Sequence, residues 1–359
     1  MDSKPGLAQG DVGGLLVNAA RGSGWALCIG AGTSLPVFPD WNQLVRNLIA
    51  RTSPKRADDL AKKLSAGFAP DSLIQAASIL SEGGQEQFAA ILSDELYRDF
   101  LACFDDSERR IVTKALAATR PGDLGSKTWS RFSSLLEREW GDRMSCLAIA
   151  PLVSEVLGTP RSPAGILSFN AEPLLLAAIN AHQANTAASN QSAATQRVDR
   201  VVRGISNRSV NRIPYVFCHG LLPVPGTEPS PYRNSPDTLV FSESAYLQLA
   251  ANLYSWQANA FLETCASRRV VFVGLSLTDA NMRRWLSWVH DSRVDELRRL
   301  GQPDPVSTQH LWLNKDPEDP ELRTWIEASV AHLGVRLVWL EQWDQVGPVL
   351  AKMLDLRAS

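Results

Sequence analysis

Cysteine is sparse in this sequence, and the cysteines that it has are isolated. Five occur among 359 residues, at positions 28, 103, 146, 218 and 265, and no two of them form a Cys-x-x-Cys pair. An odd number of widely spaced cysteines argues against a disulfide framework. It is typical of a protein kept in a reducing compartment, so we expect a cytoplasmic protein.

The sequence also lacks an excess of charge, a long apolar run and a leader segment. The formal net charge is -2. Because no long basic run is present, the chain has no electrostatic footprint of direct nucleic-acid binding. No apolar stretch is long enough to span a bilayer, and Met1–Lys4 does not open a charged-then-apolar leader. We therefore expect neither a membrane nor a nucleic acid as a direct partner.

What the sequence does have is enough apolar material for a substantial core. Hydrophobic residues make up 45% of the chain, and its length allows one large domain or two modest ones. Several apolar runs are too short for helices, which is typical of buried parallel strands. They lie at residues 25–29, 166–169, 215–218, 270–273, 311–313 and 335–340.

Two segments between these runs have a different character. From residue 53 to about residue 125 the apolar residues recur every three to four positions, which predicts a small all-helical insertion without strands. Residues 182–212 are rich in Asn, Gln, Ala, Ser and Thr and have little apolar periodicity. They predict a flexible, low-complexity surface insertion.

The first predicted strand runs directly into a glycine-rich turn, Gly30–Ser34. Gly30, Ala31 and Gly32 allow a sharp turn and a close approach to a ligand, because a glycine has no Cβ. Thr33 and Ser34 supply hydroxyls and backbone N–H groups where phosphate oxygens would lie. The match to the dinucleotide pattern G-x-G-x-x-G is incomplete because Leu35 takes the third glycine position. A tight turn without a ligand remains the alternative.

Polar residues also follow three later predicted strands. Asn170 comes after residues 166–169, His219 after 215–218, and Asn314 after 311–313. Ligand-handling residues of parallel sheets gather at these carboxyl ends. Asn170 could instead cap the next helix, and a lone histidine is more often a structural residue. A Cys218–His219 nucleophile pair is rejected because neighbouring residues of a strand point to opposite faces.

Together these segments resemble the NAD-binding signature of the sirtuin family. Gly30–Ser34 followed by Phe38–Trp41 is similar to the family's Gly-Ala-Gly-x-Ser turn and its Ile-Pro-Asp-Phe-Arg segment, with Trp41 for Phe and Asn42 for Arg. Residues 168–172 resemble Thr-Gln-Asn-Ile-Asp, with Asn170 retained. These departures are typical of the prokaryotic sirtuin-like NADase branch, which implies a Rossmann-like α/β fold. That fold has a parallel sheet with helices on both faces and an inserted helical module.

The resemblance implies a role for the residues of each matching segment. Asn170 would position a water or the ribose, and His219, followed by glycine, would be the base that activates a ribose hydroxyl. Three residues would cover the nicotinamide pocket: Pro39, Asp40 and Trp41. The remaining stations would hold the adenosine half of NAD: Gly274, Ser276, Asp279 and Asn314.

The implied activity is hydrolysis of the nicotinamide–ribose bond of NAD, with NAD as the substrate. The zinc ribbon of sirtuin deacylases has no Cys-x-x-Cys ligands here, so no zinc is expected. Two alternatives remain: an NAD- or ADP-ribose-binding regulatory subunit without turnover, and an NAD-dependent protein deacylase or ADP-ribosyltransferase. By resemblance, the chain would be a homo-oligomeric effector of anti-phage defence, controlled by a partner such as an ATPase or Argonaute-like subunit.

Overall fold

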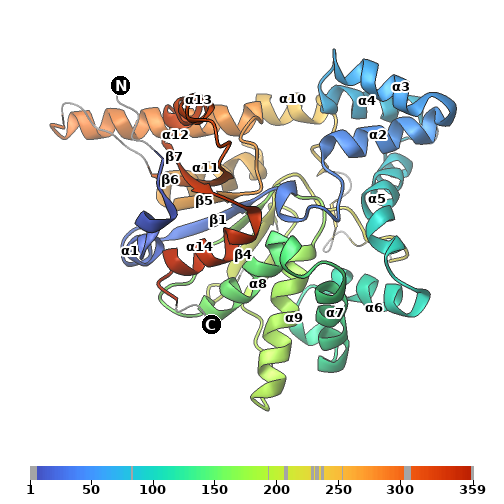
Figure 1. Ribbon diagram of the computed structural model, residues 1–359, viewed down its shortest axis with the longest axis horizontal. Coiled ribbons are helices and arrows are strands. Elements are labelled where there is room, and N and C mark those ends of the chain that lie inside the picture. Colours follow the sequence, from blue (N-terminus) through green and yellow to red (C-terminus); the bar gives the residue numbers. More distant parts are fainter. Residues whose placement is uncertain are drawn as a thin grey trace.

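The fold is built on a seven-stranded parallel sheet. The computed structural model describes residues 6–81, 84–192, 194–205, 209–227, 230, 234–235, 238–252, 254–302 and 309–356. The strands lie in the order β3-β4-β2-β1-β5-β6-β7 (Figure 1), and every neighbouring pair is parallel. Their bounds are β1 Trp25–Ile29, β2 Ile166–Ser168, β3 Val198–Val201, β4 Ile213–Phe217, β5 Arg269–Val273, β6 His310–Lys315 and β7 Val335–Leu340.

The central strand β1 shows why these runs are apolar throughout. All five of its residues are buried. Trp25, Leu27 and Ile29 belong to one hydrophobic core, and Ala26 and Cys28 belong to a second one on the other face of the sheet. A strand covered on both faces needs apolar residues at every position, and this explains the continuous run.

Helices cover both faces of the sheet. One face packs against α1 Leu15–Arg21, α8 Ser145–Val156, α9 Leu174–Ser189 and α14 Val346–Met353. The other face packs against α10 Glu243–Ala251, α11 Trp256–Ser267, α12 Ala280–Arg299 and α13 Pro320–Ala331 (Figure 1). The expected α/β fold, a parallel sheet with helices on both faces, is confirmed.

A run of helices separates β1 from β2 in the chain. It comprises α2 Trp41–Thr52, α3 Ala57–Ser65, α4 Pro70–Leu80, α5 Gly84–Ala102, α6 Asp106–Ala117 and α7 Ser126–Glu139, followed by α8 on the face of the sheet. Figure 1 shows α2 to α5 gathered beyond the carboxyl ends of the strands. The described residues between 53 and 125 contain no strand, and this is where the sequence predicts the helical module.

The segment 182–212 differs from its prediction. Helix α9 extends to Ser189, and β3 adds an edge strand with buried Val198 and Val201 that pairs with β4. The Asp199 carboxylate accepts hydrogen bonds from the Ser209 N–H at 2.7 Å and from Arg212 at 3.0 Å. A flexible insertion is therefore wrong for these residues. Ala193 and residues 206–208 lie outside the described part.

None of the helices in the described part of the chain combines the length and the apolar character needed to cross a membrane.

Candidate functional site

The register of the sheet places the predicted site residues next to one another at the carboxyl ends of adjacent strands. Ile29 of β1 lies opposite Ser168 of β2 and Val273 of β5, and Ser168 lies opposite Phe217 of β4. The residues that follow these strands therefore emerge side by side. Because β1 is flanked by β2 on one side and by β5 on the other, this edge is a topological switch point, where α/β sheets bind ligands.

The glycines of the first turn face another loop of the protein. The Gly32 N–H donates to the Gly274 carbonyl at 2.9 Å, and the Gly30 N–H donates to Val273 at 3.1 Å. A Cβ on Gly30 would lie 2.5 Å from Leu275 Cδ2, and one on Gly32 would lie 2.8 Å from the Gly274 Cα. The glycines thus allow the loops after β1 and β5 to touch.

The hydroxyls of Thr33 and Ser34 are used inside the protein. Thr33 Oγ1 donates to the Gly30 carbonyl at 2.8 Å, and Ser34 Oγ donates to Glu172 Oε1 at 2.6 Å. Both residues are buried. The N–H groups of Gly30, Gly32, Thr33 and Ser34 also donate to carbonyl oxygens of the protein. In this arrangement neither these hydroxyls nor these four N–H groups are free for an incoming phosphate.

Asn170 belongs to a buried network centred on Glu172. Its Nδ2 donates to Glu172 Oε1 at 2.9 Å and also lies 3.3 Å from Ser34 Oγ. Its Oδ1 is buried and has no partner among the described residues. The N–H of Leu174, the first residue of α9, donates to Glu172. Glu172 therefore has the capping role considered for Asn170, and the Asn170 carbonyl oxygen stays available.

The Glu172 carboxyl lies in an unusual electrostatic setting. Burial raises its pKa, and the hydrogen bonds from Ser34, from the Leu174 N–H and from Asn170 oppose that rise. No ion pair to Glu172 occurs within the described residues. The network consequently holds a carboxyl next to Asn170 by hydrogen bonds alone.

His219 lies in a box of aromatic rings. The ring centroids of Phe169, Tyr246 and Trp41 lie 4.8, 5.5 and 6.3 Å from the centroid of its imidazole. Burial lowers the pKa of His219 to about 4, although the nearby Asp279 charge acts in the opposite direction. Its Nδ1 is buried without a partner among the described residues. At neutral pH the ring is neutral and has a free position for a proton.

The backbone geometry at position 220, directly after this histidine, requires a glycine. Gly220 has a φ of +82°, and a Cβ there would lie 3.1 Å from the Thr238 carbonyl oxygen. The Val240 N–H donates to the His219 carbonyl at 3.0 Å. The segment 238–242 therefore packs directly on the His219–Gly220 backbone.

A cavity of about 570 Å³ opens in front of His219. It is bounded by the loop after β1, by the start of α4, by α10 and by the N-terminal end of α12. Six predicted site residues line it: Gly30, Ala31, Trp41, His219, Ser276 and Asp279. The start of α4 adds Pro70 and Asp71, so the helical module forms part of the wall.

A second cavity, of about 40 Å³, lies beside Asn170. Predicted site residues on its wall are Ala31, Ser34, Pro39, Asp40, Trp41 and Asn170. Both cavities share Ala31, Trp41 and Phe169. These three residues stand between the spaces that Asn170 and His219 line.

The other predicted residues take mainly structural positions. Gly32, Thr33, Gly274 and Asn314 line neither cavity. Asn314, at the end of β6, accepts the Lys315 N–H at 3.0 Å. Asp40 caps α2 by accepting the Gln43 N–H at 2.8 Å.

The loop after β5 brings Ser276 and Asp279 to the wall of the cavity in front of His219. Ser276 Oγ lies 2.7 Å from Thr278 Oγ1. Asp279 accepts the Met282 N–H at 2.8 Å as the N-cap of α12. Ser276 and Asp279 thus combine local hydrogen bonds with a place on the cavity wall.

Sequence reasoning missed Tyr246 and the part played by Glu172. Tyr246 lies on α10 with its ring beside His219, and burial together with a hydrogen bond to Asp279 raises its pKa. A tyrosine at helical spacing carries no motif. Glu172 stands where the Thr-Gln-Asn-Ile-Asp pattern has Asp, and an acid two residues after Asn170, just before a helix, is a capping signal that could have identified its role.

No group of three or more metal-binding side chains gathers within the described residues. The five cysteines are free, and four of them are buried.

Comparison with known proteins identifies part of the chain. Residues 166–337 match the family model of the SIR2-like domain. The matched range runs from β2 into β7 and includes Asn170, His219, the loop after β5 and Asn314. It does not include the turn after β1. No curated protein matches the chain.

Proposed function

We propose that this chain, which carries a SIR2-like domain at residues 166–337, hydrolyses the nicotinamide–ribose bond of NAD. SIR2-like domains act on NAD, so the coarse class of chemistry follows from the domain. The observation that carries the finer proposal is the neutral His219 imidazole with its unpartnered Nδ1 on the wall of the large cavity.

The residues present are suited to NAD as a substrate. A cavity of about 570 Å³ falls within the range of about 300–1,000 Å³ that is usual for small-molecule sites. Two buried polar atoms, His219 Nδ1 and Asn170 Oδ1, have no partner among the described residues. Both are acceptors that a ribose hydroxyl or a water could satisfy, because each can take a donated hydrogen bond.

The proposed reaction needs one bond made and one broken. A water oxygen forms a bond to the ribose C1′, the C1′–nitrogen bond of nicotinamide breaks, and one proton is released. The products are nicotinamide and ADP-ribose, or a cyclic product if a hydroxyl of the substrate attacks instead. His219 accepts the proton of a ribose hydroxyl, a proton of the attacking water restores that hydroxyl, and the proton held by His219 is the one released. Asn170 orients the attacking water or the ribose.

Charge along the large cavity supports the same reaction. Positive charge develops at the ribose centre as nicotinamide leaves, and carboxylates aimed at such a centre lower the barrier. Three carboxylates, Asp71, Glu243 and Asp279, line the cavity together with a single described cation, Arg284, so acidic side chains predominate there. Pro39, Asp40 and Trp41 would close over the nicotinamide, and Gly30–Ser34 would face the pyrophosphate.

Low NAD hydrolysis by the protein in its resting conformation is part of the proposal. The space beside Asn170 is only about 40 Å³ and is separated from the His219 cavity by Ala31, Trp41 and Phe169. Nicotinamide reaches Asn170 only if that partition moves. This supports an effector that depletes NAD when a homo-oligomeric assembly or a defence partner changes its conformation. The anti-phage role, the partner and the cytoplasmic location remain proposals.

The test is NAD consumption by the purified chain, with nicotinamide and ADP-ribose quantified. We expect His219→Ala and Asn170→Ala each to lower turnover by about 10²–10⁴-fold, the range for general acid–base groups. His332→Ala removes an exposed histidine and is the matched control. Turnover that persists in both site variants contradicts the proposal. Binding of NAD without turnover, with or without candidate partners, instead supports the regulatory-subunit alternative.

A further inference from the structure

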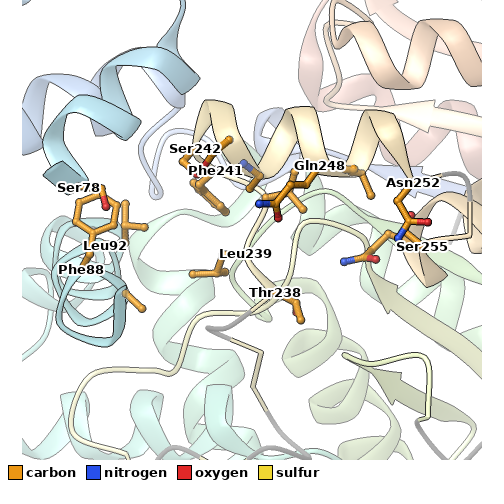
Figure 2. Close-up of a pocket in the computed structure, with 16 residues that line it drawn as sticks. Ser78, Phe88, Leu92, Thr238, Leu239, Phe241, Ser242, Gln248, Asn252 and Ser255 are labelled. Atoms are coloured by element: carbon orange, nitrogen blue, oxygen red, sulfur yellow. Dashed lines mark hydrogen bonds between the residues drawn. The ribbon is translucent and has the colours of Figure 1, made fainter. Parts of the chain in front are cut away.

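A third cavity lies on the other side of α10 from His219. It has a volume of about 310 Å³ and is bounded by α4, α5, the segment 238–242, α10 and the beginning of α11 (Figure 2). Helix α10 separates it from the His219 cavity. Ser244 and Gln248 line the third cavity, whereas Tyr246 and Leu247 line the His219 cavity.

The described lining of this third cavity is polar without charge. None of the lining residues that the structure describes is Asp, Glu, Lys, Arg or His. Amides and hydroxyls alternate with apolar walls that include Phe88, Leu239 and Phe241. An ion placed here would lose its hydration without gaining a counter-charge, so the cavity favours neutral ligands.

Two amides of the lining have hydrogen-bonding capacity to spare. Gln257 is 7% exposed, yet its side chain makes no hydrogen bond to the described residues. The Gln248 side chain also makes none there, and Figure 2 shows it extending from α10 toward Leu239. Gln248 is exposed, and neither amide is among the buried polar atoms without a partner, so water reaches both and a ligand would replace that water. Each amide offers a donor beside an acceptor.

We propose that this cavity binds a small neutral ligand with a flat ring and an amide-type edge, meaning a nucleobase or a ring carboxamide. The amide edge pairs with Gln257 and Gln248, and the ring lies against Phe88, Leu239 and Phe241. This choice follows from the donor and acceptor pairs, the apolar walls and the lack of charged side chains among the described lining residues.

The cavity is joined to His219 through short contacts. Val240 lines it, and the Val240 N–H donates to the His219 carbonyl at 3.0 Å. Phe241 also lines it, and the Phe241 ring lies 4.9 Å from the ring of Trp41 between centroids. A ligand here contacts Val240, which bonds to the His219 backbone, and Phe241, which packs against Trp41. Ligand binding therefore alters the His219 environment, and its effect on turnover rests on the proposed function.

Calorimetry with three probes tests the binding. Nicotinamide and adenosine represent the carboxamide and the nucleobase, and nicotinate is the charged counterpart of nicotinamide. We expect at least one neutral probe to bind and nicotinate to bind about ten-fold more weakly than nicotinamide or not at all. Gln257→Leu and Gln248→Leu should each weaken binding of the neutral probe about ten-fold.

Two controls make the result decisive. Gln302→Leu removes an exposed glutamine outside the cavity and should leave binding unchanged. Gln248 is exposed, so Gln248→Leu tests the cavity even if Gln257→Leu fails to fold. The proposal is overturned if neither neutral probe binds, or if binding is the same in the Gln248→Leu variant, which would place the probe in another site.

The link to His219 has a readout that does not require NAD turnover. In protein labelled at histidine, the neutral probe should shift the His219 ring signal, assigned by its loss in His219→Gln. The same probe should not shift that signal in Gln248→Leu. A bound probe that leaves the His219 signal unmoved overturns the link. Absence of NAD turnover would count against the proposed function alone.

Discussion

Gly32 and Gly274 meet backbone to backbone, with the Gly32 N–H donating to the Gly274 carbonyl at 2.9 Å. The contact joins the turn after β1 to the loop after β5 across the switch point of the sheet. Gly274 has a φ of +66°, and a Cβ on it would lie 2.4 Å from the Thr33 nitrogen. The shape of the candidate site therefore depends on two glycines that are remote in sequence.

Gly32→Ala should destabilise the protein by about 1–3 kcal/mol, the usual cost of overpacking. The new methyl group would overlap the Gly274 backbone, which cannot move aside as a flexible side chain could. Urea unfolding measures the loss. Gly67→Ala is the control, because a Cβ there meets nothing within 4 Å. Equal stability of the two variants would contradict the close contact.

Asp279→Asn should lower the pKa of His219 below its value of about 4, because the Asp279 charge is what raises it against burial. Asparagine caps a helix about as well as aspartate, so the Met282 N–H keeps an acceptor and α12 stays intact. Titration of the histidine ring signals measures the change. Asp71→Asn, on the same cavity wall, is the comparison and should have less effect. A higher pKa in Asp279→Asn would contradict the assigned electrostatics.

Local pattern was sufficient for most of the sheet. Continuous apolar runs such as Trp25–Ile29 identify buried parallel strands because both of their faces are covered. The edge strand β3 was not predicted because its sequence, Val-Asp-Arg-Val, is short and mixes apolar with charged residues. An edge strand pairs on one side only, so its polar residues can reach solvent or, like Asp199, local partners.

The candidate site was predictable only at strand ends. Asn170 and His219 could be placed because parallel strands end at one edge. Tyr246 could not, because its position beside His219 depends on how α10 packs, and nothing local encodes that. The hydrogen bond from Ser34 to Glu172 could not be predicted from the sequence either. It requires Glu172, whose distance from Ser34 in space is set by the register of β1 and β2.

Asn180→Leu should stabilise the protein by about 1 kcal/mol, because it removes a buried polar group that lacks a partner. Asn180 lies in α9, is 1% exposed, and its Nδ2 has no hydrogen-bond partner among the described residues. Thermal and urea unfolding measure the gain. Asn185→Leu, five residues later in α9, should have the opposite sign, since Asn185 bonds to Ser130 and Ser133. Destabilisation by Asn180→Leu would indicate an unseen partner for that amide.

Acid should destabilise the fold through its buried histidines. Burial lowers the pKa of His219 to about 4 and that of His310 to about 3, whereas an unfolded histidine titrates near 6.5. Between these values the unfolded chain binds more protons, so the free energy of unfolding falls as pH falls from about 6.5. Each histidine contributes up to about 1.4 kcal/mol per pH unit.

His310→Asn should flatten this dependence. His310 Nδ1 accepts the Val270 N–H at 3.2 Å, and protonation would abolish that acceptor, whereas an asparagine oxygen keeps it without titrating. Urea unfolding at several pH values between 4.5 and 7.5, a range chosen to cover the window, measures the slope. His332→Asn, at an exposed position, should change it less. The Glu172 carboxyl has the opposite effect on this slope. Burial raises its pKa in the folded protein, so its contribution to the free energy of unfolding falls as pH rises above about 4.3. An unchanged slope in His310→Asn would mean that His310 is already charged in the folded protein, contrary to its burial.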